Sequence, residues 1–356
     1  MISLACVSVP PKAFFNVFDC LIKGRIGKGS YIQKFEEKFA ESIGVKHAIA
    51  VANGTIADMI MLRALRYLNP DRDEVILPAL TFIAQANSVV WAGLKPIFVD
   101  VGSDFQIDIN QVRQLINERT LCVFPAHLLG NSSSAPADFF GDVFVLEDCC
   151  EAMGGKFMHH RLGTLGLAGS FSMFPSHTIT TGEGGIIVTG NDRFAEICRS
   201  MRDHGKVGKD FDFEYFGING KITNLQCAIG LELIDIIQEV NRIRRANVMF
   251  LNTYKPKSQT KRIDFFPTSP HCYPIVFENK ETRDRALNIF GENDIECRKL
   301  MSCVPDTKPY VDMFGFYCEE FFHNAREFSQ NGMYVPCHQN LKRKDLEKIG
   351  NVILQV

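Results

Sequence analysis

The chain has 356 residues, of which 46% are hydrophobic and 22% charged, with a formal net charge of −2. This length suggests about two domains, and the composition is typical of a globular protein. The near-neutral charge excludes a broad basic surface, so we expect no nucleic-acid partner. We also expect no membrane partner, because no apolar run approaches the ~20 residues that a membrane-spanning helix needs.

The N-terminal stretch MISLACVSVPPKAFFNVF does not resemble a signal peptide, because Pro10 and Pro11 interrupt it and no basic segment precedes an apolar core. Twelve cysteines are present without a C-x-x-C pair; the close pair is Cys149–Cys150, and Cys297 and Cys303 lie six residues apart. We therefore interpret the cysteines as reduced thiols of a cytoplasmic protein and predict no metal site.

The first two-thirds of the chain alternates helical and strand-like segments. Ser30 is expected to cap a helix through YIQKFEEKFAESIG that ends at Gly44. The strand candidates are HAIAVA, EVILP, PIFVDV, TLCVFPAH, VFVLED, SFSMF and GGIIVT, with the helical segments IADMIMLRALRYL, FIAQANSVVWAG and DINQVRQLINE between them. Several of these strands are continuously apolar, which is typical of strands covered on both faces. The pattern predicts an α/β fold with a large, mostly parallel sheet.

The last third has a different pattern. Residues 191–205 and 222–250 are still expected to be helical, but after Tyr254 the strand CYPIVFE is mixed with the helices TRDRALNIFGEN and KRKDLEKIGNVI. We predict a large domain over residues 1–245 and a smaller C-terminal α+β domain over residues 246–356.

In parallel sheets, ligands bind at the carboxyl ends of the strands. Asn53-Gly54-Thr55 joins a strand to a helix, where glycine allows close approach and the helix N-terminus attracts phosphate, although a structural turn is the better explanation of this motif taken alone. Phe82 follows the strand EVILP and could stack on a planar cofactor or lie in the core.

Two further strand ends carry ionisable groups. Glu147, Asp148 and Glu151 follow VFVL; an acid there either pairs with a cationic heterocycle nitrogen or caps the next helix. SFSMFPSHTITTGEGG places Ser172 and His177 before a glycine-rich loop. A lone histidine in a turn is commonly a solvated bystander, so its role stays open on this evidence alone.

Taken together, NGT, PALTF, VFVLED, SFSMFPSH, TTGEGG and GINGKITNLQCAIG resemble the DegT/StrS family of pyridoxal-phosphate sugar enzymes. The resemblance extends from about Gly24 to the C-terminal YVPCHQNLKRKDLEKI. It implies the aspartate-aminotransferase-like (type I) fold, a pyridoxal 5′-phosphate or pyridoxamine 5′-phosphate cofactor, and a homodimer with shared active sites.

The resemblance also implies roles for individual positions. Gly54, Thr55 and Ser172 would hold the cofactor phosphate. Phe82 would stack on the cofactor ring, Asp148 would pair with the ring nitrogen, and Glu151 would lie near the ring hydroxyl. Asn219 would reach the phosphate in the neighbouring subunit, and Arg298 and His338 would help to bind a nucleotide sugar.

One position departs from the family's aminotransferases, which have lysine where this chain has His177. Imidazole cannot form the covalent imine that such a lysine makes, and no lysine occurs between Lys156 and Lys206. Histidine here, together with AHLLGN around His127, is similar instead to the sugar 3-dehydratases, a branch of the family that includes the enzyme acting on GDP-4-keto-6-deoxymannose.

This branch implies a reaction. Glutamate would donate its amino group to the cofactor, and the enzyme would then remove the C3 hydroxyl of a nucleotide-linked 4-keto-6-deoxyhexose, a step in the biosynthesis of lipopolysaccharide O-antigen deoxysugars. His177 would act as the base, since a neutral imidazole with an ordinary pKa of ~6.5 suits proton abstraction at neutral pH. Asp148 would keep the ring an effective electron sink.

Two alternatives remain: an aminotransferase that works despite the substitution, and a non-catalytic member of the family. A related dehydratase type couples the reaction to an iron–sulfur cluster held by closely spaced cysteines that include a C-x-C pair. This chain has no such pair, so we expect no iron–sulfur cluster.

Overall fold

The main sheet matches the predicted strands one for one. The computed structural model describes residues 1–133, 140–256, 260, 263–315 and 319–356. Within them, the largest sheet has seven strands in the order β1-β9-β8-β5-β4-β2-β3. Their bounds are β1 His47–Val51, β2 Glu74–Pro78, β3 Lys95–Val99, β4 Thr120–Val123, β5 Phe144–Asp148, β8 Ala168–Ser172 and β9 Gly185–Thr189. Strand β9 runs antiparallel to both of its neighbours and the other pairs are parallel, which confirms the mostly parallel α/β sheet.

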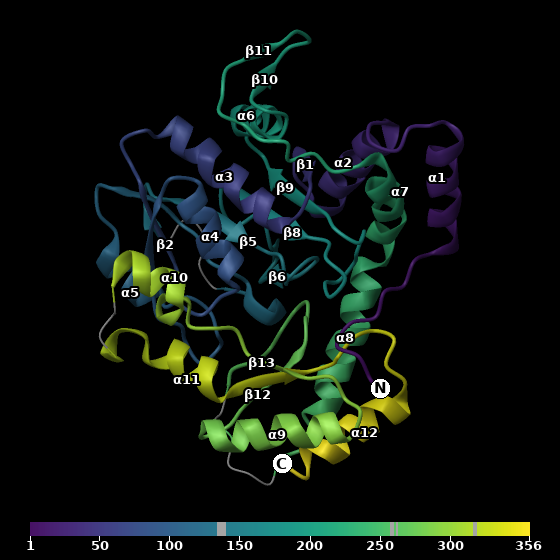
Figure 1. Cartoon of the computed structure of the whole chain (residues 1–356), viewed down its shortest axis with the longest axis vertical. Helices are drawn as coiled ribbons and strands as arrows, with labels where there is room; N and C mark the ends of the chain where they lie inside the picture. The colour runs from purple at the N-terminus through teal and green to yellow at the C-terminus, as the bar shows by residue number, and fades with distance from the viewer. Residues whose placement is uncertain (134–139, 257–259, 261–262, 316–318) are drawn as a thin grey trace.

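Helices cover this sheet, and α3 lies across β8 and β9 (Figure 1). The helices of this part are α1 Pro11–Ile22, α2 Ser30–Ile43, α3 Gly54–Leu68, α4 Ile83–Trp91, α5 Ile109–Leu115, α6 Asp192–Arg202 and α7 Asn224–Leu233, with the short η1 Leu128–Gly130 and η3 Ile234–Ile236. Two small two-stranded hairpins accompany it: β6 Lys156–Phe157 with β7 His160–Arg161, and β10 Lys206–Val207 with β11 Asp212–Phe213. None of the helices in the described ranges combines the length and the apolar character needed to cross a membrane.

The C-terminal third forms a second unit around a three-stranded antiparallel sheet in the order β12-β14-β13. Its elements are β12 Tyr273–Val276, α9 Lys280–Glu292, β13 Arg298–Lys299, η4 Val304–Asp306, α10 Lys308–Phe314, η5 Glu319–Phe322, α11 His323–Asn331, β14 Gly332–Val335 and α12 Arg343–Ile353. Helix α8, Ile237–Leu251, runs from the large sheet to this unit (Figure 1). The predicted boundary at residues 245/246 falls inside α8, and Ile2 pairs with Ile295 of the C-terminal unit. The division into domains therefore stays a prediction.

The N-terminal region differs from the sequence-based expectation in two places. Helix α1, for which no element was predicted, begins at Pro11; the missing N–H of proline has no cost there, because the first N–H groups of a helix have no partner within it. The expectation that Ser30 caps α2 is wrong: Gly29 is the cap, without a side-chain hydrogen bond, and Ser30 is the first helical residue. Gly44 ends α2 as predicted, at a φ of 82° that favours glycine.

Two close contacts position the elements that carry the site. A Cβ on Gly185 would lie 2.2 Å from the carbonyl oxygen of Asn53, so only glycine allows the start of α3 to sit against β9. On the other face of the sheet, the rings of Phe39 in α2 and Phe171 in β8 meet edge to face, with centroids 5.4 Å apart, and both are fully buried.

Phe171→Ala should lower the free energy of unfolding by about 3–5 kcal/mol, because it leaves a cavity between α2 and β8. Chemical denaturation followed by circular dichroism measures this loss. Phe266→Ala is the matched control: its side chain is 79% exposed, and the substitution should change the unfolding free energy by less than about 0.5 kcal/mol. Equal effects of the two substitutions would contradict the packing argument.

Candidate active site

A cavity of about 480 Å³ opens where β2, β5 and β8 end, between the large sheet and the C-terminal unit. Eight of the ten predicted site residues line it: Gly54, Thr55, Phe82, Asp148, Glu151, Ser172, His177 and Arg298. They come from segments up to 244 residues apart (298 − 54) in the chain. The cavity therefore lies where we predicted it, at the carboxyl ends of parallel strands.

One wall of the cavity is the start of α3. The helix begins at Gly54, and the Asn53 side chain caps it by accepting the N–H of Ile56 at 2.9 Å. A Cβ on Gly54 would lie 2.7 Å from Sγ of Cys150 and 2.9 Å from Cβ of Ser172. The backbone therefore approaches these side chains as closely as glycine permits. The free N–H groups of this first turn and the Ser172 hydroxyl form a cradle suited to a phosphate.

Asp148 lies at the end of β5, opposite this cradle. Its Oδ1 accepts the N–H of Cys150 at 3.0 Å, and burial raises the pKa of the Asp148 carboxyl. A second carboxyl, that of Asp58 in α3, faces it and accepts a hydrogen bond from the Ser170 hydroxyl. Burial, and then the negative charge of Asp148, raise the pKa of Asp58 well above its usual range. A ligand cation placed beside this pair would be stabilised.

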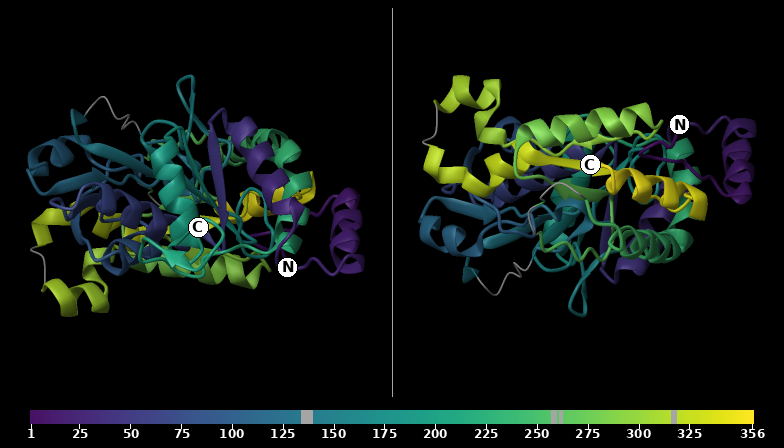
Figure 2. Two further views of the ribbon diagram at one scale, coloured as in Figure 1. Left: turned by 90° about the horizontal axis from the view of Figure 1, so that it is seen from above. Right: turned by 90° about the horizontal axis from the view of Figure 1, so that it is seen from below.

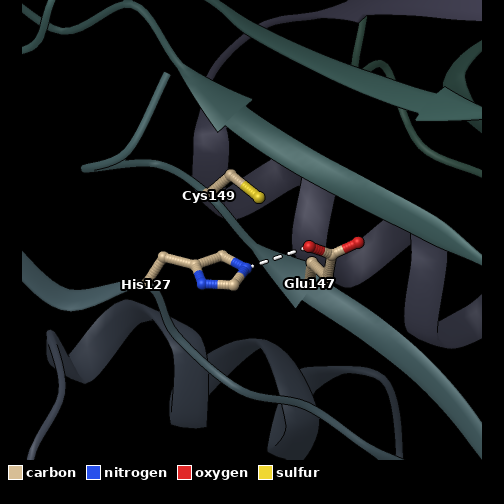
Figure 3. Close-up of side chains that lie close together, drawn as sticks. All are labelled: His127, Glu147 and Cys149. Atoms are coloured by element: carbon tan, nitrogen blue, oxygen red, sulfur yellow. Dashed lines mark hydrogen bonds and ion pairs between the residues drawn. The ribbon is translucent and has the colours of Figure 1, made fainter. Parts of the chain in front are cut away.

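A histidine–glutamate pair braces β5 behind the cavity (Figure 3). Nε2 of His127 lies 2.9 Å from Oε2 of Glu147, and Nδ1 of His127 accepts the N–H of Ser133 at 3.0 Å. Because Nδ1 accepts an N–H, Nε2 is the nitrogen that donates to Glu147. Glu147 is also held by backbone donors, among them the N–H of Leu165 at 2.6 Å, and the Cys149 thiol lies beside the pair. These groups satisfy one another, as a structural network does.

His177 follows β8 and faces a second histidine. The ring centroids of His177 and His271 are 5.3 Å apart, and the buried Nδ1 of each ring has no hydrogen-bond partner among the described residues. The buried guanidinium of Arg244, from α8, donates to the carbonyl oxygen of His177 at 3.1 Å and to that of Pro270 at 3.2 Å. Its Nε donates to Oε1 of Gln339 at 3.0 Å. Arg244 thus ties both histidine segments to the C-terminal unit.

The electrostatics of this corner keep both imidazoles neutral. Burial lowers the pKa of His177 well below its usual range, and His271 and the Arg244 cation lower it further. Burial and Arg244 lower the pKa of His271 to about 3. Burial raises the pKa of Glu151 to about 7, although its carboxyl accepts the N–H of Leu129 at 2.7 Å. At neutral pH, His177 therefore presents an unprotonated nitrogen that is able to accept a proton.

Two predicted residues lie outside the cavity. Asn219 forms an isolated bridge with Asp203. His338 is buried: its Nε2 donates to the carbonyl oxygen of Ser3 at 3.1 Å, and its Nδ1 accepts the N–H of Asn340 at 3.3 Å. Hydrogen bonds within this chain occupy both ring nitrogens of His338, so neither nitrogen is free to bind a sugar.

Sequence reasoning missed several groups that the structure brings to the site. Asp58, Gln85 and His271 line the cavity, and Arg244 lies behind His177. The sequence could have indicated Asp58, since it is a lone acid in the apolar run IADMIML. Gln85 is buried, and its Oε1 lacks a hydrogen-bond partner within the described ranges, so it is open to a ligand donor. His271 and Arg244 had no local signal, because their proximity to His177 is set by the packing of α8.

The donor set fits a phosphorylated aromatic cofactor. The glycine cradle suits a phosphate and the buried carboxyl pair suits a protonated ring nitrogen. Phe82 exposes 59% of its surface at the cavity, where its ring is available for stacking. These features match the pyridoxal-phosphate site that the sequence resemblance implied.

Comparisons with known proteins agree with this fit. Residues 12–354 match the model of the DegT/DnrJ/EryC1/StrS aminotransferase family. A GDP-perosamine synthase from Vibrio cholerae is 34% identical over 94% of this chain and 93% of its own length. A GDP-4-keto-6-deoxy-D-mannose 3-dehydratase from Escherichia coli O55:H7 is 28% identical over 87% of this chain and 88% of its own. The solved structure of an E. coli dehydratase of this name, with bound hydrated PLP, superposes with a TM-score of 0.90 over 99% of both chains at 24% identity. The protein is therefore an aspartate-aminotransferase-fold member of the DegT/DnrJ/EryC1/StrS family of pyridoxal-phosphate-dependent sugar-modifying enzymes.

Proposed function

We propose that this protein is a nucleotide-sugar 3-dehydratase that uses pyridoxamine 5′-phosphate, regenerated with glutamate, to remove the C3 hydroxyl of a 4-keto-6-deoxyhexose. The observation that carries the proposal is His177. It stands in the cofactor cavity with an unpartnered nitrogen, and no lysine is among the described residues that line the cavity. Because the His177 side chain cannot hold the cofactor covalently, the amine of pyridoxamine phosphate would stay free to react with the ketone of the sugar.

The other lining residues have roles that follow from their chemistry. Gly54, Thr55 and Ser172 would hold the cofactor phosphate, and Phe82 would stack on the ring. Asp148 would hold the ring nitrogen in its protonated form. When bound, the cofactor supplies the electron sink for the reaction. The side chains of this pocket then have to place the sugar, exclude water and move one proton.

His177 is suited to move that proton. As a neutral imidazole it removes a proton beside the reacting carbon, and as an imidazolium it returns the proton to the C3 hydroxyl, which leaves as water. The buried Arg244 cation favours the neutral form of His177, so the base is ready before the substrate arrives. The same cation disfavours a long-lived imidazolium, which promotes donation of the proton to the leaving group.

The relatives' names support a GDP-linked substrate. Both the perosamine synthases and the 3-dehydratases are named for GDP sugars, and a solved dehydratase variant contains GDP-perosamine. Arg298, on β13, lines the cavity with a largely exposed side chain; its Nη2 pairs with Glu296 at 3.1 Å, and its remaining N–H groups could bind the diphosphate. A Salmonella typhimurium relative is named a lipopolysaccharide biosynthesis protein, which supports a place in the biosynthesis of O-antigen sugars.

A second candidate is a GDP-sugar aminotransferase. It is favoured by sequence identity, since perosamine synthases are 32–34% identical and the 3-dehydratases 26–28%. Position 177 separates the two candidates, because the family's aminotransferases carry a lysine there. In one solved dehydratase variant, a histidine is replaced by lysine and the serine before it by asparagine. In this chain His177 also follows a serine, Ser176, as the histidine of that dehydratase does.

We also propose a homodimer. Asn219 lies outside this chain's own cavity, as a residue that serves a neighbouring subunit would. Helix α1 projects from one end of the molecule in both views of Figure 2, and it exposes Phe14, Phe15 and Phe18. Such a cluster of exposed aromatic rings is typical of a protein interface.

The proposed reaction makes a direct prediction. With glutamate, pyridoxal phosphate and GDP-4-keto-6-deoxymannose, the protein should release a 3-deoxy product and ammonia, detected by mass spectrometry. His177→Asn should lower the turnover about 10²–10⁴-fold, because the proton carrier is lost, with little change in cofactor affinity. His177→Lys should gain a cofactor link that borohydride traps. A stable 4-amino sugar as the sole product of the wild-type protein would overturn the dehydratase proposal in favour of the aminotransferase.

The electrostatic role of Arg244 can be tested by titration. Arg244→Gln should raise the pKa of both His177 and His271, because a nearby buried cation is removed. The Cε1–H resonances of the two imidazoles report this shift in NMR spectra. Arg242→Gln, on the exposed side of the same helix, is the control and should leave both titrations unchanged. Unchanged histidine titrations in a folded Arg244→Gln protein would exclude this role.

The shared-site dimer predicts complementation. The protein should elute as a dimer in light-scattering chromatography, and Phe15→Asp should weaken the association. His177→Asn and Asn219→Ala should each be poorly active, whereas an equal mixture refolded together should recover roughly a quarter of the wild-type sites. Recovery occurs because one site of each mixed dimer carries neither substitution. A mixture no more active than its parts, in a confirmed dimer, would show that Asn219 does not serve the partner.

A further inference from the structure

Asp58 is a buried acid that the proposed function leaves without a role. It lies one turn into α3, lines the cavity and is 2% exposed. The Ser170 hydroxyl donates to its Oδ1. One carboxyl oxygen of Asp58, one of Asp148 and Sγ of Cys150 all lie within 4.8 Å of one another. The two acids come from different elements, so the packing of α3 on the sheet creates the pair.

The surroundings of the pair supply little positive charge. On the β5 side it faces the Cys149 and Cys150 thiols, which burial and the nearby carboxyls keep protonated, and the carboxyl of Glu151, whose charge raises the pKa of Asp148. His127, the basic side chain on this side, hydrogen-bonds Glu147 and accepts the N–H of Ser133, and its coulombic effect lowers the pKa of Asp148. Two buried carboxylates at this separation repel each other, so burial and repulsion both favour one shared proton over two negative charges.

We propose that Asp58 and Asp148 share one proton and that Asp58 carries it when the cofactor is bound, so that Asp148 remains the carboxylate that pairs with the ring nitrogen. The inference rests on the cofactor position given under the proposed function. Asp58 is thus a positioning residue: it acts on the ring through Asp148.

The contacts decide which of the two acids takes the proton. The Asp148 carboxylate is half-buried and accepts the Cys150 N–H at 3.0 Å, and a bound ring N–H would be its second donor. Asp58 is more deeply buried, and the hydrogen bond described above comes from a neutral hydroxyl. Protonation of Asp58 removes the repulsion that would otherwise raise the proton affinity of Asp148. The ring nitrogen therefore keeps its proton, which the electron sink requires.

Infrared spectroscopy of protein labelled with carbon-13 aspartate tests the proposal, because the label separates aspartate from the carboxyl of Glu151. At neutral pH, both the cofactor-free and the loaded protein should show the carbonyl band of one protonated aspartate. Asp58→Asn should abolish this band in the loaded protein. Asp100→Asn, at a buried acid outside the cavity that accepts three backbone N–H groups, is the matched control and should leave the band in place.

Cofactor affinity is the second readout, measured by titration with pyridoxal phosphate. Asp58→Asn mimics the neutral acid and should bind within about threefold of the wild-type protein, whereas Asp148→Asn should bind at least about tenfold more weakly. Absence of the aspartate band at neutral pH, or its persistence in Asp58→Asn, would overturn the proposal. The band in the cofactor-free protein tests the shared proton even if the dehydratase reaction proves wrong.

Discussion

The site depends on how closely the start of α3 approaches the sheet. At Gly185 and Gly54, an added Cβ would meet backbone or side-chain atoms at 2.2 Å and 2.7 Å, so two glycines permit this packing. The approach sets the phosphate cradle against Ser172 and brings Asp58 over Asp148. A helix start that is suited to a phosphate and a pair of buried acids thus both follow from one packing contact.

The same region concentrates ionisable groups that water does not solvate. On one side, two carboxyls have raised pKa values because they are buried together. On the other, burial and the charge of a buried arginine keep the ring nitrogens of two histidines unprotonated. The cavity is therefore lined both by acids that can pair with a cation and by a base that can accept a proton. A ring that draws electrons toward its nitrogen needs both from a protein.

Much of the fold was predictable, because each strand of the main sheet is a short apolar run bounded by turn residues. The failures were local. Helix α1 was missed because two prolines were interpreted as a break, although proline suits the first turn of a helix. Ser30 was placed at a cap that Gly29 occupies, since neighbouring small residues compete for that position. The cavity was predicted from strand ends, and eight of the ten expected side chains meet there.

The sequence by itself determined the order of the elements, the glycine at the start of α3 and the presence of His177 in a segment without lysine, because these are properties of short contiguous segments. Only the tertiary structure decided the surroundings of those residues. Asp58 meets Asp148 because α3 lies on β8 and β9, and Arg244 meets His177 because α8 crosses to the C-terminal unit. Burial and charge depend on neighbours that are distant in the chain, so the pKa shifts that prepare this site arise only when the chain folds.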